Sequence, residues 1–168
     1  NWRLYGGANW LDTEIKANSS RPDTVGNEAP YTPEYTANLG LEVTFPFVRD
    51  WEFFTRVDTR FVGETWFHTV QAGDRPTIFM PLFQLANPGV DGAGFLGTAE
   101  YSVSRRDSYA IADWRLGFRN DSWAVTAFAT NLLNESYVEE VIPAPEFGGT
   151  FSAPGTLRRY GLEVSFYY

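Results

Sequence analysis

Hydrophobic and polar residues alternate strictly in the last segment of the chain. Its apolar positions are Tyr160, Leu162, Val164, Phe166 and Tyr168. A period of two predicts a β-strand with one apolar and one polar face. The chain ends on an aromatic residue, and an apolar, uncapped edge strand of this kind would recruit other chains if the sheet were soluble. The pattern therefore favours the terminal strand of an outer-membrane β-barrel, which pairs with the first strand and faces lipid.

The same alternation recurs in five earlier segments, although Phe128 interrupts it in the last of these. The six predicted strands cover about residues 2–16, 35–45, 51–67, 108–119, 123–131 and 156–168. The expected fold class is all-β, an antiparallel transmembrane β-barrel segment of about six strands. One surface should carry Leu39, Leu41, Val43, Leu116, Val164 and Phe166. The opposite surface should carry Asn38, Glu42, Arg56, Asp58, Asp113, Arg115 and Glu163.

The connections between these strands alternate in length. Residues 46–50 and 120–122 form short polar turns, whereas 17–34, 68–107 and 132–155 are long and hold most of the Pro and Gly. Outer-membrane barrels have short periplasmic turns and long extracellular loops. The alternation therefore predicts a barrel segment whose C-terminus lies at the periplasmic end.

Aromatic residues are concentrated where strands meet connections, which predicts two girdles at the two membrane interfaces. The predicted periplasmic girdle consists of Phe45, Phe47, Trp51, Phe118, Trp123, Phe166, Tyr167 and Tyr168. The predicted outer girdle consists of Trp10, Trp66, Phe67 and Tyr109.

Composition narrows the chemistry. The 168 residues carry a net charge of −8, no Cys and a single His. An acidic chain argues against nucleic acid as a partner, and a lone His without Cys leaves no triad or His-rich metal site. We expect His68 to be a solvated rim residue. The sequence predicts neither an enzyme nor a cofactor or metal site.

Two C-terminal segments resemble the barrel of TonB-dependent outer-membrane receptors. The first runs from Trp123 to Tyr137 (WAVTAFATNLLNESY) and the second from Leu157 to Phe166 (LRRYGLEVSF). Family members have a Trp-led strand, an Asn-Leu-hydrophobic-Asn/Asp segment before a Tyr, and a final strand with an aromatic-Gly step and a terminal aromatic. Residues 33–41 and 109–117 are similar to earlier strands of the same barrel.

The resemblance implies a roughly 22-stranded barrel plugged by an N-terminal domain. Residues 1–168 would be its C-terminal part, a piece of a longer protein without the plug and earlier strands. Such receptors import scarce ligands, most often iron–siderophore complexes, energised by the TonB complex through an N-terminal region missing here. The other implied partners are outer-membrane lipid, lipopolysaccharide and the barrel-assembly machinery. The implied assembly signal in the final strand is Tyr160, Gly161, Phe166 and Tyr168.

Two charge patterns are candidates for function. The predicted lumen-facing residues are Arg56, Asp58, Arg60, Asp113, Arg115 and Arg119. They could pair across the barrel wall or against the plug, or could steer an anionic ligand. The loop 132–155 carries Glu135, Glu139, Glu140 and Glu146 and no Lys or Arg. It could be simply solvated, could bind Ca²⁺ through its carboxylates, or could favour neutral or cationic cargo.

Two other architectures stay open. A complete eight-stranded barrel with a structural or adhesion role would need two further strands within 77–104, at 77–80 and 97–103. Against it, Pro76, Pro81 and Pro88 interrupt the stretch, and Pro is excluded from interior strands. A soluble β-sandwich binding module is the other alternative.

Overall fold

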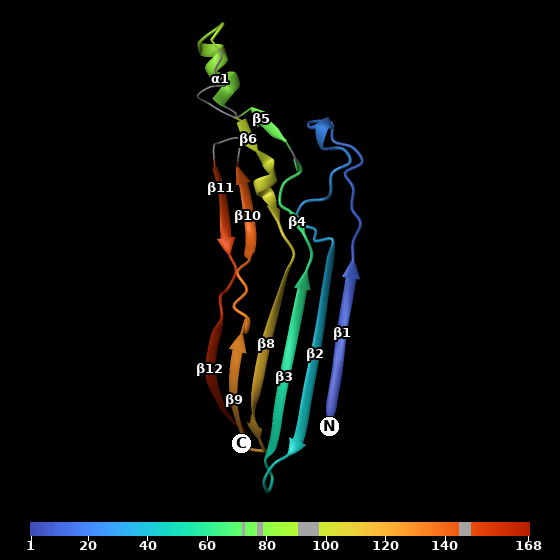
Figure 1. Cartoon of the computed structure of the whole chain (residues 1–168), viewed down its shortest axis with the longest axis vertical. Helices are drawn as coiled ribbons and strands as arrows, with labels where there is room; N and C mark the ends of the chain where they lie inside the picture. The colour runs from blue at the N-terminus through green and yellow to red at the C-terminus, as the bar shows by residue number, and fades with distance from the viewer. Residues whose placement is uncertain (72, 77–78, 91–97, 145–148) are drawn as a thin grey trace.

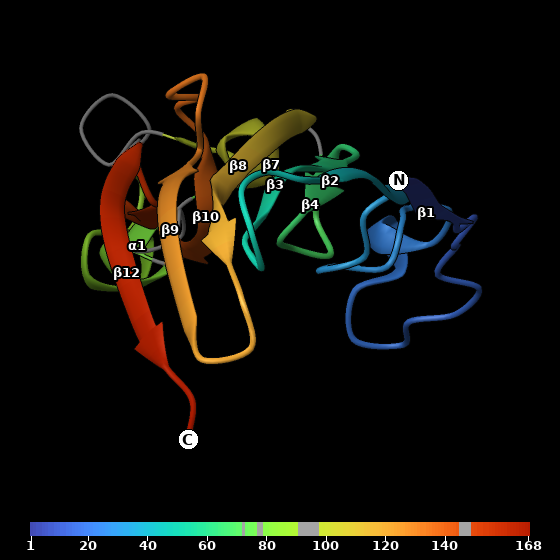
Figure 2. The same ribbon diagram turned by 90° about the horizontal axis from the view of Figure 1, so that it is seen from below.

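Six antiparallel strands form one sheet in the order β1-β2-β3-β8-β9-β12 (Figure 1). The computed structural model describes residues 1–71, 73–76, 79–90, 98–144 and 149–168. The strands of the sheet are β1 (Trp2–Trp10), β2 (Tyr35–Pro46), β3 (Glu52–Val62), β8 (Tyr109–Arg119), β9 (Trp123–Thr130) and β12 (Arg159–Phe166). The predicted fold class and strand number are confirmed. Seen from the end with the short turns, the strands follow one another across the molecule from β1 to β12 (Figure 2).

The two ends of the sheet differ as the connection lengths predict. The short β2–β3 and β8–β9 turns and both chain termini lie at one end, and the long connections extend from the other (Figure 1). These connections are not structureless. They contain β4 (Thr65–Trp66) paired with β7 (Arg105–Arg106), β5 (Asp74–Pro76) with β6 (Thr98–Glu100), and β10 (Val138–Ala144) with β11 (Gly149–Pro154). They also hold the helix α1 (Phe79–Ala86) and the 3₁₀ turns η1 (Pro22–Thr24) and η2 (Tyr101–Ser104).

Two strand boundaries were predicted too long. β1 ends at Trp10, and the segment that follows it runs on beside the returning chain with only separate backbone hydrogen bonds, which the Leu11 and Ile15 N–H groups donate to Glu34 and Asn27. The third strand ends at Val62. Gly63 then donates its N–H to the Tyr35 carbonyl, a Cβ on Gly63 would press on the Tyr35 ring, and pairing resumes only at β4. The alternation alone could not show where the ladder is interrupted.

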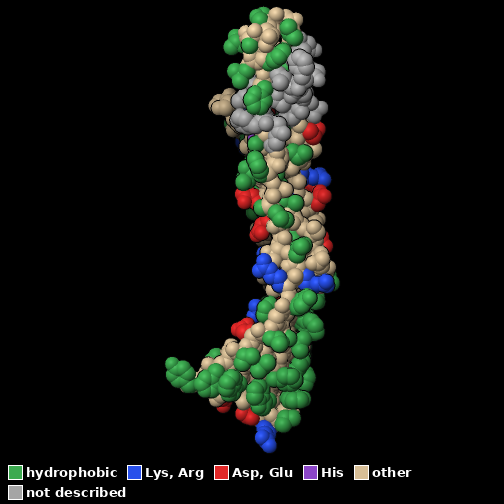
Figure 3. Space-filling view, turned by 90° about the vertical axis from the view of Figure 1, so that its left-hand side faces the viewer, with side chains coloured by type: hydrophobic (Ala, Val, Ile, Leu, Met, Phe, Trp, Pro, Cys, Tyr) green, Lys and Arg blue, Asp and Glu red, His purple; other side chains and the backbone are tan. Residues whose placement is uncertain are grey.

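The register separates two faces as predicted. Leu4, Leu41, Val57 and Trp114 are successive partners across four strands, and Arg3, Glu42, Arg56 and Arg115 form the neighbouring row. On the apolar face Leu39 is 51% exposed and Val164 62%, so no second layer covers them. Hydrophobic side chains gather over the lower part of the molecule, where the sheet lies (Figure 3). The uncovered apolar face rules out a β-sandwich for this sheet.

The buried apolar side chains of the described chain lie toward the loop end. They are Val62, Phe67, Val70, Met80, Tyr101, Ile111 and Val141. The sheet itself therefore has no conventional core, which suits a wall whose two faces meet different surroundings. Among the described residues, no helix has the length and apolarity required to span a membrane.

The predicted periplasmic girdle is present as packed rings at the short-turn end. Phe45 lies 4.8 Å from Phe53, Phe47 lies 4.8 Å from Phe118, and Trp123 lies 4.7 Å from Phe166 between ring centroids. These contacts join β2, β3, β8, β9 and β12 at one level.

The predicted outer girdle is wrong for two of its four members. Trp10 is exposed and stacks on Tyr35 at 5.8 Å. Phe67, however, is only 6% exposed and packs edge-on against Tyr31, while Tyr109 falls on the polar face and stacks on Tyr137 at 4.3 Å. Both rings also contact the Arg106 guanidinium. The positions of the aromatic residues predicted the end of the sheet at which the rings lie but not the direction in which each ring points.

Phe128 breaks the alternation of β9 because it lies on the polar face against a glycine. It is the Cα partner of Gly161 in β12, and a Cβ on Gly161 would meet the Phe128 ring at 2.8 Å. Tyr5 lies against Gly40 in the same way. Each glycine leaves a gap that the ring of the neighbouring strand fills.

The eight-stranded alternative is not supported. Residues 79–80, half of one proposed extra strand, begin the helix α1. Residues 98–100 form β6, but β6 pairs only with β5, outside the six-stranded sheet, and residues 101–104 form a 3₁₀ turn. Thr77, Ile78 and Gly97 lie outside the described residues.

We expect Gly117→Val to weaken the β8–β9 pairing. A Cβ at Gly117 would overlap the carbonyl oxygen of Val125 and lie 2.9 Å from the Thr126 Cα, both backbone atoms that cannot move aside. The expected loss is about 1–3 kcal/mol of unfolding free energy, measured by urea unfolding of the complete protein in detergent. Gly7→Ala is the control, because its Cβ would meet only the flexible Asn38 amide at 3.2 Å. Equal losses for both variants would contradict this account.

Candidate functional site on the polar face

All six predicted lumen-facing residues lie on the polar face of β3 and β8. Arg56, Asp58 and Arg60 alternate along β3, and Asp113, Arg115 and Arg119 alternate along β8. The register sets Arg56 opposite Arg115 and Asp58 opposite Asp113. Directly opposite like charges destabilise a strand pair, so these residues must find their partners elsewhere.

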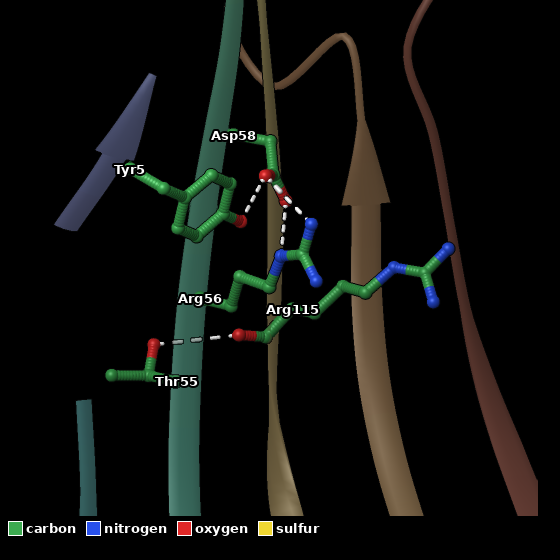
Figure 4. A network of polar contacts seen from close by, with 5 residues as sticks. All are labelled: Tyr5, Thr55, Arg56, Asp58 and Arg115. Carbon is green, nitrogen blue, oxygen red and sulfur yellow. Dashed lines mark hydrogen bonds and ion pairs between the residues drawn. The ribbon is translucent and has the colours of Figure 1, made fainter. Parts of the chain in front are cut away.

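Asp58 finds its partner within its own strand. Arg56 donates from Nε to Asp58 Oδ2 (2.6 Å) and from Nη2 to Oδ1 (2.9 Å), and the Tyr5 hydroxyl donates to Oδ1 (2.5 Å; Figure 4). The Arg56 guanidinium also lies 5.2 Å from the Tyr5 ring centroid. Gly40, between Tyr5 and Asp58 in the row, provides the room for the ring. Sequence reasoning missed Tyr5, although a Tyr among small residues on the polar face of β1 was the available signal.

Arg119 pairs across strands. It donates to Glu52 Oε1 from Nε (2.9 Å) and Nη2 (2.7 Å), and Glu42 lies 3.9 Å away. Arg115 behaves differently, because its side chain extends over β9 and away from Arg56 (Figure 4). In the described part of the chain neither Arg115 nor Arg60 forms an ion pair. Two of the predicted arginines thus hold the wall together, and two are available to other groups.

Arg60 stands between two hollows of the polar face. One, of about 260 Å³, is lined by Tyr5, Asn38, Leu39, Asp58, Thr59, Arg60, Ile111 and Asp113. The other, of about 360 Å³, lies nearer the long connections and is lined by Arg60, Ile111, Asp113, Thr130, Asn131, Tyr137, Glu139, Thr156 and Arg159. Both mix cationic, anionic and hydroxyl groups, which suits a polar ligand or a polar protein surface.

Asn131 holds the end of β9 to both ends of the loop that follows. It is 2% exposed and has a positive φ of 48°. Its backbone N–H donates to Asp113 Oδ1 (2.8 Å), and its Nδ2 donates to the carbonyls of Glu135 (2.8 Å) and Thr156 (3.0 Å). Its Oδ1 accepts the Glu135 N–H (2.8 Å). The Asn-Leu-Leu-Asn motif therefore has a structural role, which residue spacing alone did not reveal.

The acidic loop does not form a metal site within the described residues. Glu139 and Glu140 lie in β10 and Glu135 precedes it, and no group of three or more potential ligands occurs there or elsewhere in the described chain. Glu146 lies outside the described residues. The prediction for His68 is wrong, because its ring is half-buried 4.9 Å from the Tyr101 ring and its Nδ1 accepts the Val70 N–H (3.0 Å).

Comparison with known proteins identifies the family to which this amphipathic sheet belongs. A family model described as "TonB dependent receptor-like, beta-barrel" matches residues 1–132. The chain belongs to this family. Proteins of the TonB-dependent receptor family reside in the outer membrane.

Two crystal structures of other receptors share the fold of this TonB-dependent receptor barrel. The ferric yersiniabactin uptake receptor FyuA from Yersinia pestis matches with a TM-score of 0.68 at 14% identity, over 97% of this chain and 20% of that one. BauA, the ferric preacinetobactin receptor from Acinetobacter baumannii, matches with a TM-score of 0.60 at 19% identity, over 98% of this chain and 19% of that one. The chain thus spans about a fifth of each.

The residues of the implied assembly signal lie in or just beyond β12, at one edge of the sheet. Tyr160 and Phe166 are exposed on the apolar face, and Tyr168 follows the end of the strand. Gly161 lies on the polar face against Phe128.

We expect Asn131→Ala to destabilise the receptor barrel far more than Asn134→Ala. The first removes three part-buried hydrogen bonds to the backbone of Glu135 and Thr156, for an expected loss of about 2–4 kcal/mol. The second removes one bond, from the exposed Arg158 N–H, for about 1 kcal/mol or less. Both residues have positive φ, so backbone strain is shared. Urea unfolding of the complete receptor in detergent measures the difference, and equal losses would contradict the role assigned to Asn131.

Proposed function

We propose that this chain is part of the barrel of an outer-membrane receptor that takes up iron–siderophore complexes. Family membership supports a transport receptor, and the observation that carries the siderophore assignment is the match of nearly the whole chain to the barrels of two ferric siderophore receptors. TonB supplies the energy through a region outside this chain. The chain has a transport role and no enzymatic one.

In this proposal residues 1–168 are the C-terminal strands of the barrel, with the plug and the earlier strands outside the chain. The described sheet supports this, because β1 and β12 are its two edges and do not pair with each other. An open edge within lipid leaves backbone groups unpaired at several kcal/mol each. Further strands must therefore lie between these edges in the membrane.

The sheet also gives the proposal an orientation. The short turns and the C-terminus face the periplasm, and the long connections with β10, β11 and α1 face the outside. The lipid face contacts outer-membrane lipid, and lipopolysaccharide surrounds the outer rim. Ligand arriving from outside meets the long connections first and then the two hollows beside Arg60.

The lumenal charges are consistent with a polar cargo. Arg56 and Arg119 are engaged by carboxylates of the wall, whereas Arg60 and Arg115 are exposed on the polar face and form no ion pair among the described residues. We assign a share in steering anionic ligand to these two arginines. The acidic hairpin nearby opposes a highly anionic cargo, which favours complexes of low net charge.

We expect deletion of the complete receptor gene to abolish uptake of one ferric siderophore. Uptake of radioactive iron presented in a panel of ferric siderophores measures this, with a plasmid copy restoring it and a strain without TonB serving as the energy control. Unchanged uptake of every complex in the deletion strain would refute the siderophore assignment. Uptake that persists without TonB would refute the energy coupling.

We expect removal of Phe166–Tyr168 to reduce assembly of the complete receptor several-fold. These residues end the edge strand that the barrel-assembly machinery would bind by strand addition. Phe166 anchors the strand through its ring contact with Trp123 at 4.7 Å. The heat-modifiable, membrane-inserted fraction measures assembly at equal synthesis. Leu162→Ala, an exposed apolar change on the same strand and face, is the control. Normal insertion of the truncated receptor would contradict this role in assembly and would show that these aromatics are only lipid-facing surface.

A further inference from the structure

The extension of the wall above β3 and β8 contains one half-buried arginine that lies among polar and aromatic groups. Arg106 in β7 donates from Nη2 to Thr65 Oγ1 (2.8 Å), on the partner strand β4. Its guanidinium carbon lies 5.4 Å from the Phe67 ring centroid and 5.0 Å from that of Tyr109. Thr65 is 2% exposed and Phe67 6%, so this guanidinium is packed into the extension rather than spread over its surface.

The same guanidinium reaches the hairpin of β10 and β11. Arg106 Nη1 donates to the carbonyls of Glu139 (3.0 Å) and Val138 (3.4 Å), at the start of β10. These are the hydrogen bonds from β7 to the hairpin among the described residues. One planar side chain thus bonds two segments more than thirty residues apart in the sequence. A guanidinium can do this because its donors point in fixed, diverging directions.

Several features show that its position is energetically unfavourable for the Arg106 side chain itself. Its Nε is buried and has no hydrogen-bond partner among the described residues. Its bonded acceptors are carbonyl and hydroxyl oxygens rather than carboxylates, and burial lowers the pKa of the guanidinium. Buried unpaired donors are rare in folded proteins. The position is therefore better explained by what Arg106 holds than by its own solvation.

The base of the β10–β11 hairpin, which Arg106 holds, borders the mouth of the lumen. Tyr137 and Glu139, at the base of the hairpin, line the hollow of about 360 Å³ together with Arg60 and Arg159 of the wall. The Tyr137 ring stacks on Tyr109 at 4.3 Å and covers Gly155 at the other arm of the hairpin. Movement of the hairpin base would thus displace one side of the hollow while the strands stay in place.

We infer that Arg106 is a positioning residue that fixes the β10–β11 hairpin to the β4–β7 extension and so completes the ligand-binding hollow at the mouth of the lumen. The part that concerns ligand rests on the proposed function. The fixing of the hairpin does not, because it follows from contacts within the chain.

The test compares Arg106→Met with Arg105→Met in the complete, membrane-inserted receptor without ligand. Methionine keeps an apolar stem between the rings but donates no hydrogen bond. Arg105 is the matched control, because it neighbours Arg106 but forms its ion pairs at the surface, with Glu64 and Asp107. Hydrogen exchange of the backbone amides of residues 138–142, 144 and 150–153 should be roughly tenfold faster in Arg106→Met and unchanged in Arg105→Met. Equal exchange in the two variants would overturn the inference.

Two further variants secure the interpretation. Thr65→Val removes the Nη2 acceptor, together with the hydrogen bond that Thr65 Oγ1 donates to the Gly63 carbonyl (3.2 Å) within its own segment, and should accelerate exchange in the hairpin in the same direction by a smaller factor. If Arg106→Met does not reach the membrane, Thr65→Val decides, and unchanged exchange there overturns the inference. Arg106→Lys keeps the charge but not the diverging donors, so it should restore only part of the protection. Complete restoration would overturn the geometric role.

The ligand part is tested by binding of the ferric siderophore identified in the uptake assay. Arg106→Met should raise the dissociation constant roughly tenfold at an unchanged number of heat-modifiable receptors. Faster exchange with unchanged affinity would overturn the link to the hollow. If the unaltered receptor binds no ferric siderophore, the proposed function fails, while the exchange measurement still decides the fixing of the hairpin.

Discussion

The whole arrangement depends on one constraint, the two-residue period of a β-strand between two unlike surroundings. Each strand of the sheet must offer apolar side chains to one face and polar ones to the other, and a shift of one residue would reverse every side chain. The rows across β1, β2, β3 and β8 keep this alternation without a slip. The sheet therefore needs no buried core of its own, and its polar face is free to carry charges that a soluble sheet of this size could not place inward.

Those charges are arranged in a way that the strand pairing makes necessary. Since Arg56 faces Arg115 and Asp58 faces Asp113, the opposite charges beside Arg56 are Asp58, two residues along its own strand, and Glu42, directly across in β2. Arg56 takes the first solution with Asp58, and Arg119 takes another with Glu52 directly across. Tyr5 completes the first pair from two strands away, through the space left by Gly40. Side chains as well as backbone hydrogen bonds thus connect several strands of the wall.

The sequence was sufficient to predict the features that repeat along the chain. It was insufficient to predict those that depend on single contacts. Alternation predicted the six strands, their faces and the end at which the short turns lie. It could not show that regular pairing stops after Trp10, because apolar residues continue beyond the ladder. It also placed Tyr109 and Phe67 in a girdle, whereas both rings are held by Arg106. The role of Asn131 and the position of Tyr5 over Gly40 likewise arise from groups distant in sequence, which no local pattern encodes.

The pairings of the long connections are nested inside those of the wall. Between β3 and β8 lie β4 with β7, then β5 with β6, and α1 lies within the innermost pair. Residues added within α1 leave every one of these pairings intact, whereas a residue added inside a paired strand shifts that strand against its partner. The two arms between the β4–β7 and β5–β6 pairs, residues 67–73 and 101–104, already differ in length, so over evolutionary time the length of this loop can vary both at its tip and between the pairs. Diversity of the outer surface is thus available to the receptor without any alteration of the barrel beneath it.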